Sequence, residues 1–185
     1  MQFVIPLALI LLAIGIVAAV YYNKMVASRN YMTEAWSSID VFLKKRSNLI
    51  PALVETVKGY AAHEKKLLEE LTALRSKALK ADSPEEKIAS EKMLGSSLGN
   101  ILVLSENYPD LKANTNFQEL QRQLFTIETD IESARRYYNG TVRNNNNLVE
   151  SFPGNIFAGM FHFTKGLFFE IDESEKQMPV FSFDK

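Results

Sequence analysis

The stretch "FQELQRQLFTIETDIESARRYY", from Phe117 to Tyr138, carries apolar residues at intervals of three and four. This spacing places them on one face of an α-helix, and its regularity is typical of the packing seam of a left-handed helical bundle. The members of the seam are Phe117, Leu120, Leu124, Ile127, Ile131, Ala134 and Tyr138. The stretch therefore predicts a long helix that packs against other helices.

The rest of the chain repeats this helical pattern, without the alternation typical of strands. A first helix is predicted to reach about Arg46, and a second to begin near residues 47–51, because proline is tolerated in a first turn. A third begins with Ser83 as N-cap and Pro84 behind it. We expect an all-α protein with an up-and-down antiparallel four-helix bundle. The apolar stripe of the second helix is Leu53, Val57, Tyr60, Leu67, Leu71, Leu74 and Ala78.

The N-terminal segment "FVIPLALILLAIGIVAAVYY", from Phe3 to Tyr22, contains no charged residue. About twenty apolar residues span a hydrocarbon core of roughly 30 Å, so this segment predicts a transmembrane helix. A cleaved signal peptide is the alternative, but no basic residues precede the apolar run and the cleavage site is poor. Lys24 and Arg29 follow the span, and the preference of positive charges for the cytoplasm predicts a single-pass protein with a cytoplasmic C-terminal domain.

Charge and cysteine content narrow the range of functions. The chain has 21 basic and 22 acidic residues, so we expect no overall basic surface and no nucleic-acid partner. It has no cysteine, which excludes disulfides and thiolate zinc sites. We expect a transmembrane anchor at 1–22, a helical bundle at 23–151, an aromatic membrane-proximal segment at 152–171 and a flexible tail at 172–185.

The sequence "HEKKL", from His63 to Leu67, places one of the two histidines beside a carboxylate. A zinc-protease helix needs a second histidine four residues after the first, and Leu67 occupies that position. The chain also lacks a glycine-rich phosphate loop and a nucleophile elbow. A hydrolase that uses His63 and Glu64 is thus a remote alternative, and we expect no catalytic residue, metal or cofactor.

The stretch "FPGNIFAGMFHFTKGLFFEI", from Phe152 to Ile171, is aromatic and carries only Lys165 and Glu170 as charged residues. One interpretation is that it folds back and covers the apolar end of the bundle. The other is that it lies in the membrane interface and contacts lipid, as amphipathic segments do. The residues expected at the interface are Phe152, Phe157, Phe161, Phe163, Phe168 and Phe169.

Charged side chains on the helical seams are expected to pair in the interior. Arg46, Glu64 and Arg135 are the candidates for such buried polar contacts, because a buried charge needs a partner. The fourth helix poses a separate question, since its length would carry Asn144–Asn147 towards lipid that cannot solvate amides. A bend or break near Gly140 would resolve this conflict, as would a tilt of the bundle.

Five blocks of sequence resemble the LemA family, in the order in which that family has them. They are "YNKMVASRN", "AWSSIDVFLKKRSNLIPALVETVKGYAAHE", "ENYPDLKANTNFQELQRQL", "ESARRYYNGTVRNNNN" and "FPGNIFAGMF". The resemblance implies an N-terminally anchored protein of the bacterial inner membrane, with a four-helix bundle and no established enzymatic activity. His162 departs from the family pattern, which often has glycine at this place.

An antiparallel bundle brings the turns "KKRSNLIP" (44–51) and "ENYPDLKAN" (106–114) together at the end farthest from the membrane. We expect this end to bind a protein partner, and the resemblance suggests a membrane protease or a stress-response protein. The predicted partner-binding residues are Asn48, Pro51, Asn107, Tyr108, Pro109, Asp110 and Lys112. A rigid turn without a partner is the alternative for the same residues. A different function, a self-assembling homo-oligomeric membrane scaffold or membrane-remodelling protein, would be favoured by a second exposed seam on one helix.

Overall fold

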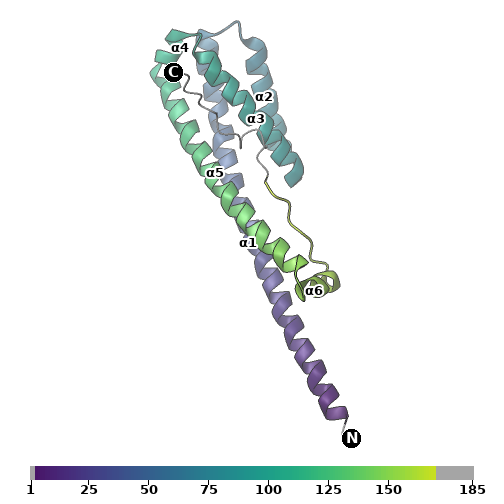
Figure 1. Cartoon of the computed structure of the whole chain (residues 1–185). Helices are drawn as coiled ribbons and strands as arrows, with labels where there is room; N and C mark the ends of the chain where they lie inside the picture. Colours follow the sequence, from purple (N-terminus) through teal and green to yellow (C-terminus); the bar gives the residue numbers. More distant parts are fainter. Residues whose placement is uncertain (1–2, 170–185) are drawn as a thin grey trace, which may run out of the picture. The chain divides into compact units, whose positions relative to one another are not determined.

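Every element of regular secondary structure in the described residues, 3–169, is helical (Figure 1). The computed structural model has no strand in that range, which confirms the all-α prediction. The predicted tail at 172–185 and the last two residues of the aromatic segment lie outside the described residues. The helices are α1 (Val4–Tyr60), α2 (Lys65–Lys80), α3 (Pro84–Ser105), α4 (Pro109–Ala113), α5 (Thr115–Glu150) and α6 (Gly154–Phe161).

The chain divides into two compact units, and both α1 and α5 contribute to each. The anchor unit comprises Met1–Met32 and Tyr138–Lys185, and the bundle unit comprises Thr33–Tyr137. The anchor unit therefore holds the first part of α1, the last part of α5 and all of α6, while α2, α3 and α4 belong to the bundle unit. Each unit has its own buried cluster of apolar side chains.

Apolar side chains from α1, α2, α3 and α5 form the core of the bundle unit, where these helices lie side by side (Figure 1). All members of the predicted α5 seam are buried or half-buried, which confirms the packing face of that helix. Burying one large apolar side chain stabilises a protein by ~1.5–3 kcal/mol. The core residues are Ile50, Leu53, Val57, Ala61, Leu68, Leu71, Leu74, Ala78, Leu94, Leu98, Ile101, Leu111, Phe117 and Leu124.

Helix α1 passes through Pro51 without a break, so the turn predicted around this residue is wrong. Proline lacks the N–H that would bond the carbonyl four residues earlier, which is the carbonyl of Ser47. The Nε of Arg75 on α2 donates to this carbonyl at 2.8 Å and replaces the missing bond. Asn48 and Pro51 are therefore exposed residues inside a helix and not parts of a turn.

Replacing Arg75 by alanine is expected to lower the free energy of unfolding by about 1–3 kcal/mol, because the carbonyl of buried Ser47 loses its donor. The same substitution should cost less in a Pro51→Ala background, where the alanine N–H restores the helical bond. Urea unfolding of the detergent-solubilised chain, followed by the fluorescence of Trp36, measures both losses. Equal losses in the two backgrounds would contradict this role of Arg75.

The true turn between α1 and α2 occupies residues 61–64. Tyr60, which we expected on a buried stripe, is exposed because α1 ends there. The connection between α2 and α3 follows the sequence prediction, since the Ser83 hydroxyl accepts a hydrogen bond from the backbone N–H of Glu86 at 3.1 Å and Pro84 begins α3. The residues at this terminus thus determine where α3 begins.

Helix α5 continues unbroken through Gly140, so the structure shows no break at that glycine. Two of the asparagines beyond it, Asn145 and Asn146, find partners in the chain's own C-terminal segment. The amide of Asn145 donates to the carbonyl of Thr164 at 3.1 Å, and the amide of Asn146 donates to the carbonyl of Gly166 at 3.1 Å. These two side chains are therefore satisfied by protein and do not need solvent.

The N-terminal part of α1 is long and apolar enough to cross a membrane. None of its most apolar window is buried within the structure, as expected for side chains that meet lipid and not protein. Among the residues that the structure describes, α1 is the one helix that meets these criteria. It is a candidate membrane anchor, and we call its apolar N-terminal part together with Phe3, residues 3–22, the candidate span.

Candidate functional site

Two turns meet in the bundle unit and form a candidate surface for a partner. We call them the paired turns; they comprise residues 61–64 and 106–114. The Tyr108 hydroxyl donates to Oε1 of Glu64 at 3.0 Å, and Nδ2 of Asn114 donates to the Tyr60 hydroxyl at 2.9 Å. The first bond connects one turn with the other, and the second connects residues 106–114 with the last residue of α1, so that both turns are held in a fixed arrangement.

The second of the paired turns is also ordered from within. Oδ1 of Asn114 accepts the backbone N–H of Phe117 at 2.9 Å and thereby caps α5. Lys112 pairs with Glu106 at 2.5 Å, and its carbonyl accepts from Nε2 of Gln118 at 3.0 Å. The turn is therefore built from many specific contacts over few residues.

The structure places most of the predicted partner-binding residues on the paired turns. Asn107, Pro109, Asp110 and Lys112 are exposed there, and Tyr108 is half-buried. The expected place of Asn48 and Pro51 in a turn was wrong, because α1 does not turn at proline and both residues lie inside that helix. The surface that connectivity predicted thus exists, with residues 61–64 in place of residues 44–51.

Glu64 lies at the start of α2 and not inside the bundle, where we had expected it. Its hydrogen bond with Tyr108, together with desolvation and the negative charge of Glu64, raises the pKa of the Tyr108 hydroxyl above its ordinary value. Tyr108 therefore remains a neutral donor at physiological pH. His63 is exposed beside this bond. Within residues 3–169, no group of three His, Cys, Asp or Glu residues could hold a metal ion.

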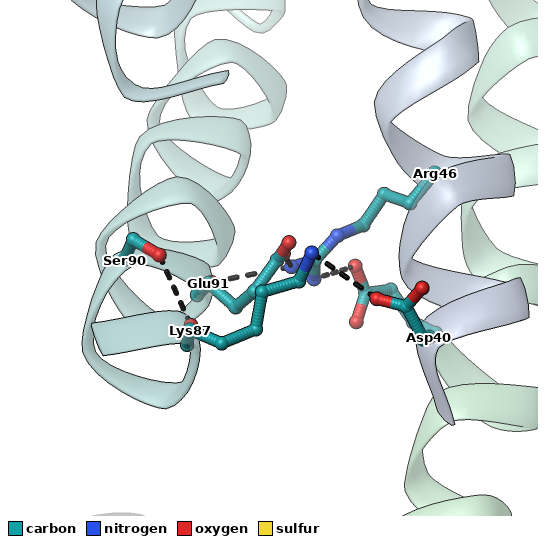
Figure 2. Close-up of polar contacts among 6 residues, drawn as sticks. Asp40, Arg46, Lys87, Ser90 and Glu91 are labelled. Carbon is teal, nitrogen blue, oxygen red and sulfur yellow. Dashed lines mark hydrogen bonds and ion pairs between the residues drawn. The ribbon is translucent and has the colours of Figure 1, made fainter. Parts of the chain in front are cut away.

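An ion cluster centred on Arg46 lies inside the bundle unit (Figure 2). The side chain of Arg46 on α1 is 1% exposed and pairs with Glu91 on α3, which is 2% exposed. Arg46 also pairs with the half-exposed Glu128 on α5 at 2.6 Å and donates to the backbone carbonyl of Glu91 at 3.2 Å. Beside the cluster, Lys87 pairs with Asp40 at 3.1 Å. Arg46 thus connects α1 with both α3 and α5.

Burial by itself would lower the pKa of the Arg46 guanidinium, but the charges of Glu128 and Glu91 and their hydrogen bonds raise it above its ordinary value. Sequence reasoning identified Arg46 but neither glutamate. The sequence did contain one signal that Glu91 faces the interior. Glu91 lies three residues before Leu94, on the same face of the helix, and Leu94 is buried. Arg135, also expected to make a buried contact, is half-buried on α5.

Aromatic rings join α6 to the end of the candidate span within the anchor unit. Tyr21 stacks on Phe157 with ring centroids 5.4 Å apart, and Tyr22 meets Phe161 edge-on at 5.1 Å. Phe163 also meets Tyr22 edge-on, at 5.8 Å. Tyr21 and Tyr22 are the last residues of the candidate span, so α6 lies at the level where this span ends.

The chain turns sharply between α5 and α6. A Cβ on Gly154 would lie 2.1 Å from the carbonyl oxygen of Leu148, so this position requires glycine. Helix α6 ends at His162, whose φ of 58° is left-handed and whose N–H bonds the carbonyl of Ala158. The histidine thus occupies the kind of backbone position for which glycine is usual.

Helix α6 presents an apolar face that none of the described residues, 3–169, covers. Ile156 and Met160 are 53% and 61% exposed, and their spacing of four puts them on one side of α6. Phe152, in the turn before α6, is 81% exposed. The sequence interpretation named Phe152 but missed Ile156 and Met160, although the spacing was visible. Phe157 and Phe169 are buried, so these two side chains pack inside the protein instead of meeting lipid. The other phenylalanines of the predicted set are half-buried or exposed.

Comparison with known proteins finds relatives whose names denote no catalytic activity. Protein LemA of Metamycoplasma hominis is 25% identical over 170 residues, which cover 90% of this chain and 78% of that protein. Magnetosome protein MamQ 2 of Paramagnetospirillum magneticum is 21% identical over 175 residues, which cover 80% of this chain and 64% of that protein, and magnetosome protein MamQ 1 gives the same values. This chain therefore spans less than two thirds of either magnetosome protein.

A further comparison matches this chain to a whole family of proteins instead of to a single relative. The model of the LemA family matches residues 35–183, which include nearly all of the bundle unit, all of α6 and the segment after it. Because this match extends over most of the chain, the protein belongs to the LemA family.

Proposed function

We propose that this chain is a membrane-anchored interaction protein, without catalytic activity of its own, that presents its paired turns to a protein partner. The observation that carries the proposal is the continuity of α1. This single helix contains the candidate span at one end and reaches the paired turns at the other. The chain thus joins a means of membrane attachment to an ordered, exposed surface.

We place the anchor in the bacterial inner membrane, with the bundle in the cytoplasm. Lys24 and Arg29 are the first charged residues after the candidate span, and positive charges favour the cytoplasmic side. The ammonium group of Lys24 lies 5.5 Å from the ring centre of Tyr21, so charge and aromatic ring occupy the same level. Aromatic and basic residues together are typical of a membrane–water boundary.

The exposed face of α6 supports a second contact with lipid, parallel to the anchor. Ile156 and Met160 form this face, with the exposed Phe152 just before the helix, and α6 packs by aromatic contacts against the last residues of the candidate span. A bilayer that surrounds the span would therefore reach α6 at its interface. Burial of these apolar side chains in the interface would compensate for their exposure in the protein.

The paired turns are suited to binding because their shape is set before a partner arrives. The bonds from Tyr108 to Glu64 and from Asn114 to Tyr60 fix both backbones, which reduces the entropy lost on binding. The exposed surface offers the carboxylate of Asp110 for a basic partner group, and the half-buried Tyr108 ring for apolar contact. A protein partner with a basic residue beside an apolar one would match this surface.

A photo-crosslinking amino acid at Asp110 is expected to capture this partner in cells. The matched control carries the same amino acid at Asn48, which is equally exposed but lies along α1 in the same unit. Gentle detergent extraction, sizing and mass spectrometry identify what is joined. A second protein captured from Asp110 and not from Asn48 supports the proposal, and its capture should fall to background after Tyr108→Ala. Equal capture from both positions, or none, would contradict it.

Crosslinking of this chain only to itself would favour a self-assembling membrane scaffold instead. That alternative needs an exposed apolar seam on a helix. Phe125 on α5 and Val103 on α3 are the most exposed large apolar residues of the described bundle unit. The residues three and four positions to either side of each are polar or glycine, so neither belongs to a seam. Isolated apolar residues of this kind are usual on soluble surfaces.

A further inference from the structure

A row of asparagines on α5 binds the backbone of the chain's own C-terminal segment. We call this row, Asn139, Asn145 and Asn146, the asparagine row, and residues 164–169 the bound segment. The amide of Asn146 accepts the N–H of Gly166 at 2.8 Å and donates to its carbonyl at 3.1 Å. The amide of Asn139 does the same with Phe169, at 2.8 and 3.0 Å. Each amide thus bonds both backbone groups of one residue, as a neighbouring strand would.

The spacing of the two amides fits an extended polypeptide. Asn139 and Asn146 are seven residues apart on α5, which corresponds to about 10.5 Å along the helix axis. Gly166 and Phe169 are three residues apart; a β-strand would turn their backbone groups to opposite sides, whereas a polyproline II chain repeats every three residues and covers about 9 Å in that length. The segment runs antiparallel to α5, because the later residue bonds the earlier asparagine. Further bonds reach the carbonyls of Thr164, from Asn145, and of Leu167, from the Tyr138 hydroxyl.

Two side-chain positions of the bound segment are restricted. A Cβ on Gly166 would lie 2.8 Å from Sδ of Met32 and 3.5 Å from Cγ1 of Val142, so glycine fits there without moving the flexible end of the Met32 side chain. Phe169 is 2% exposed, while Leu167 between them is about half exposed. The site therefore recognises a backbone together with the pattern Gly-x-x-Phe, and it leaves the intervening side chains largely free.

We propose that the asparagine row is a binding site for an extended Gly-x-x-Phe segment, and that it accepts such a segment from another polypeptide as well as from its own chain. The hydrogen bonds that the asparagine row and Tyr138 make with the bound segment all reach main-chain atoms, which a peptide of the same backbone conformation offers whatever its side chains. The bound segment lies on the surface and is joined to the fold through a non-helical stretch after α6, so its release leaves the helices intact. This site belongs to the anchor unit and is independent of the paired turns.

A labelled peptide with the sequence HFTKGLFF, that of residues 162–169, tests the site. The full-length chain carries Gly166→Val and Phe169→Ala, which weaken its own segment and leave the asparagines in place. Fluorescence anisotropy in detergent should show binding of the peptide, about tenfold or more weaker after a further Asn146→Ala, since two hydrogen bonds are lost. Asn144→Ala is the matched control and should bind as before, because Asn144 is exposed outside the row. If the doubly substituted chain lost helicity, Phe169→Ala alone would carry the same comparison.

A zero-length crosslink distinguishes the sources of the segment. Lys165 in the bound segment pairs with Glu150 on α5 at 2.9 Å, so a carbodiimide joins them where the site is occupied. In a mixture of ¹⁴N- and ¹⁵N-labelled wild-type chains, pairs of mixed label identify a second copy as the source. If every crosslinked pair carries a single label and the peptide still binds, the segment that the site accepts from another polypeptide comes from a different protein. Absence of peptide binding, or binding that Asn146→Ala does not weaken, would overturn the proposal.

Discussion

Replacing Arg46 by methionine is expected to lower the free energy of unfolding of the bundle unit by about 3–5 kcal/mol. The substitution keeps most of the apolar stem but removes the guanidinium that pairs with Glu91. Glu91 is 2% exposed and would remain as a buried carboxylate without its ion pair, which costs far more than the loss of an exposed one. Glu128 is half exposed and can turn to water. Urea unfolding in detergent, followed by Trp36 fluorescence, gives the loss.

Two variants show whether the loss comes from the stranded charge. Adding Glu91→Leu to the Arg46→Met chain should restore most of the stability, because an apolar pair then replaces the ion pair in the same space. Lys87→Met removes the neighbouring pair with the half-exposed Asp40, and its loss should stay below about 1 kcal/mol. If Arg46→Met and Lys87→Met lowered the free energy of unfolding by similar amounts, the burial of the Arg46 cluster would not determine how much it stabilises the bundle unit.

The interior partners of Arg46 illustrate what a single sequence leaves open. The seam of α5 was predictable because its apolar residues recur at three and four positions along one continuous helix. The pairing of Arg46 with Glu91 joins residues that only the packing of α1 against α3 brings together. A charged residue on a seam predicts that it has a partner. Which residue that partner is depends on how far each helix is shifted along its neighbour in the bundle.

The turn at the end of α1 was misplaced for a similar reason. Proline is a sound local signal for the first turn of a helix, and Pro51 was therefore used to start one. The donor that allows Pro51 inside α1 is Arg75, which lies on the next helix and carries no local mark of this role. The start of α3 was predicted correctly, because Ser83 and Pro84 supply all the chemistry of that terminus themselves.

The C-terminal part of the chain was predicted in outline only. Its aromatic composition indicated contact with an apolar environment, but not which side chains face protein. Phe157 is buried because its ring stacks on Tyr21, a residue more than a hundred positions earlier. Asn144–Asn147 were expected to conflict with lipid, whereas Asn145 and Asn146 bond the backbone of the segment that follows α6. Both results depend on contacts between distant parts of the sequence.

A tryptophan placed at Met160 is expected to lie in the membrane interface and to be quenched strongly by lipids with brominated acyl chains. Met160 is 61% exposed on the apolar face of α6, and α6 packs against Tyr21 and Tyr22 at the end of the candidate span. An apolar side chain at that level gains free energy by entering the boundary between headgroups and acyl chains. Trp36 is the only natural tryptophan, so Trp36→Phe gives a background in which one residue reports.

Two further tryptophans on α1 calibrate this measurement in vesicles that contain the full-length chain. Ile16→Trp lies within the candidate span and should be quenched fully. Tyr31→Trp replaces an exposed aromatic residue on the same helix, nine positions and therefore roughly 13 Å beyond Tyr22, and should be quenched little. Met160→Trp should be quenched strongly, like Ile16→Trp, and its quenching should be greatest with bromines placed close to the headgroups. Quenching no stronger than that of Tyr31→Trp would mean that α6 faces water, and the exposed residues Phe152, Ile156 and Met160 would then need a protein to cover them.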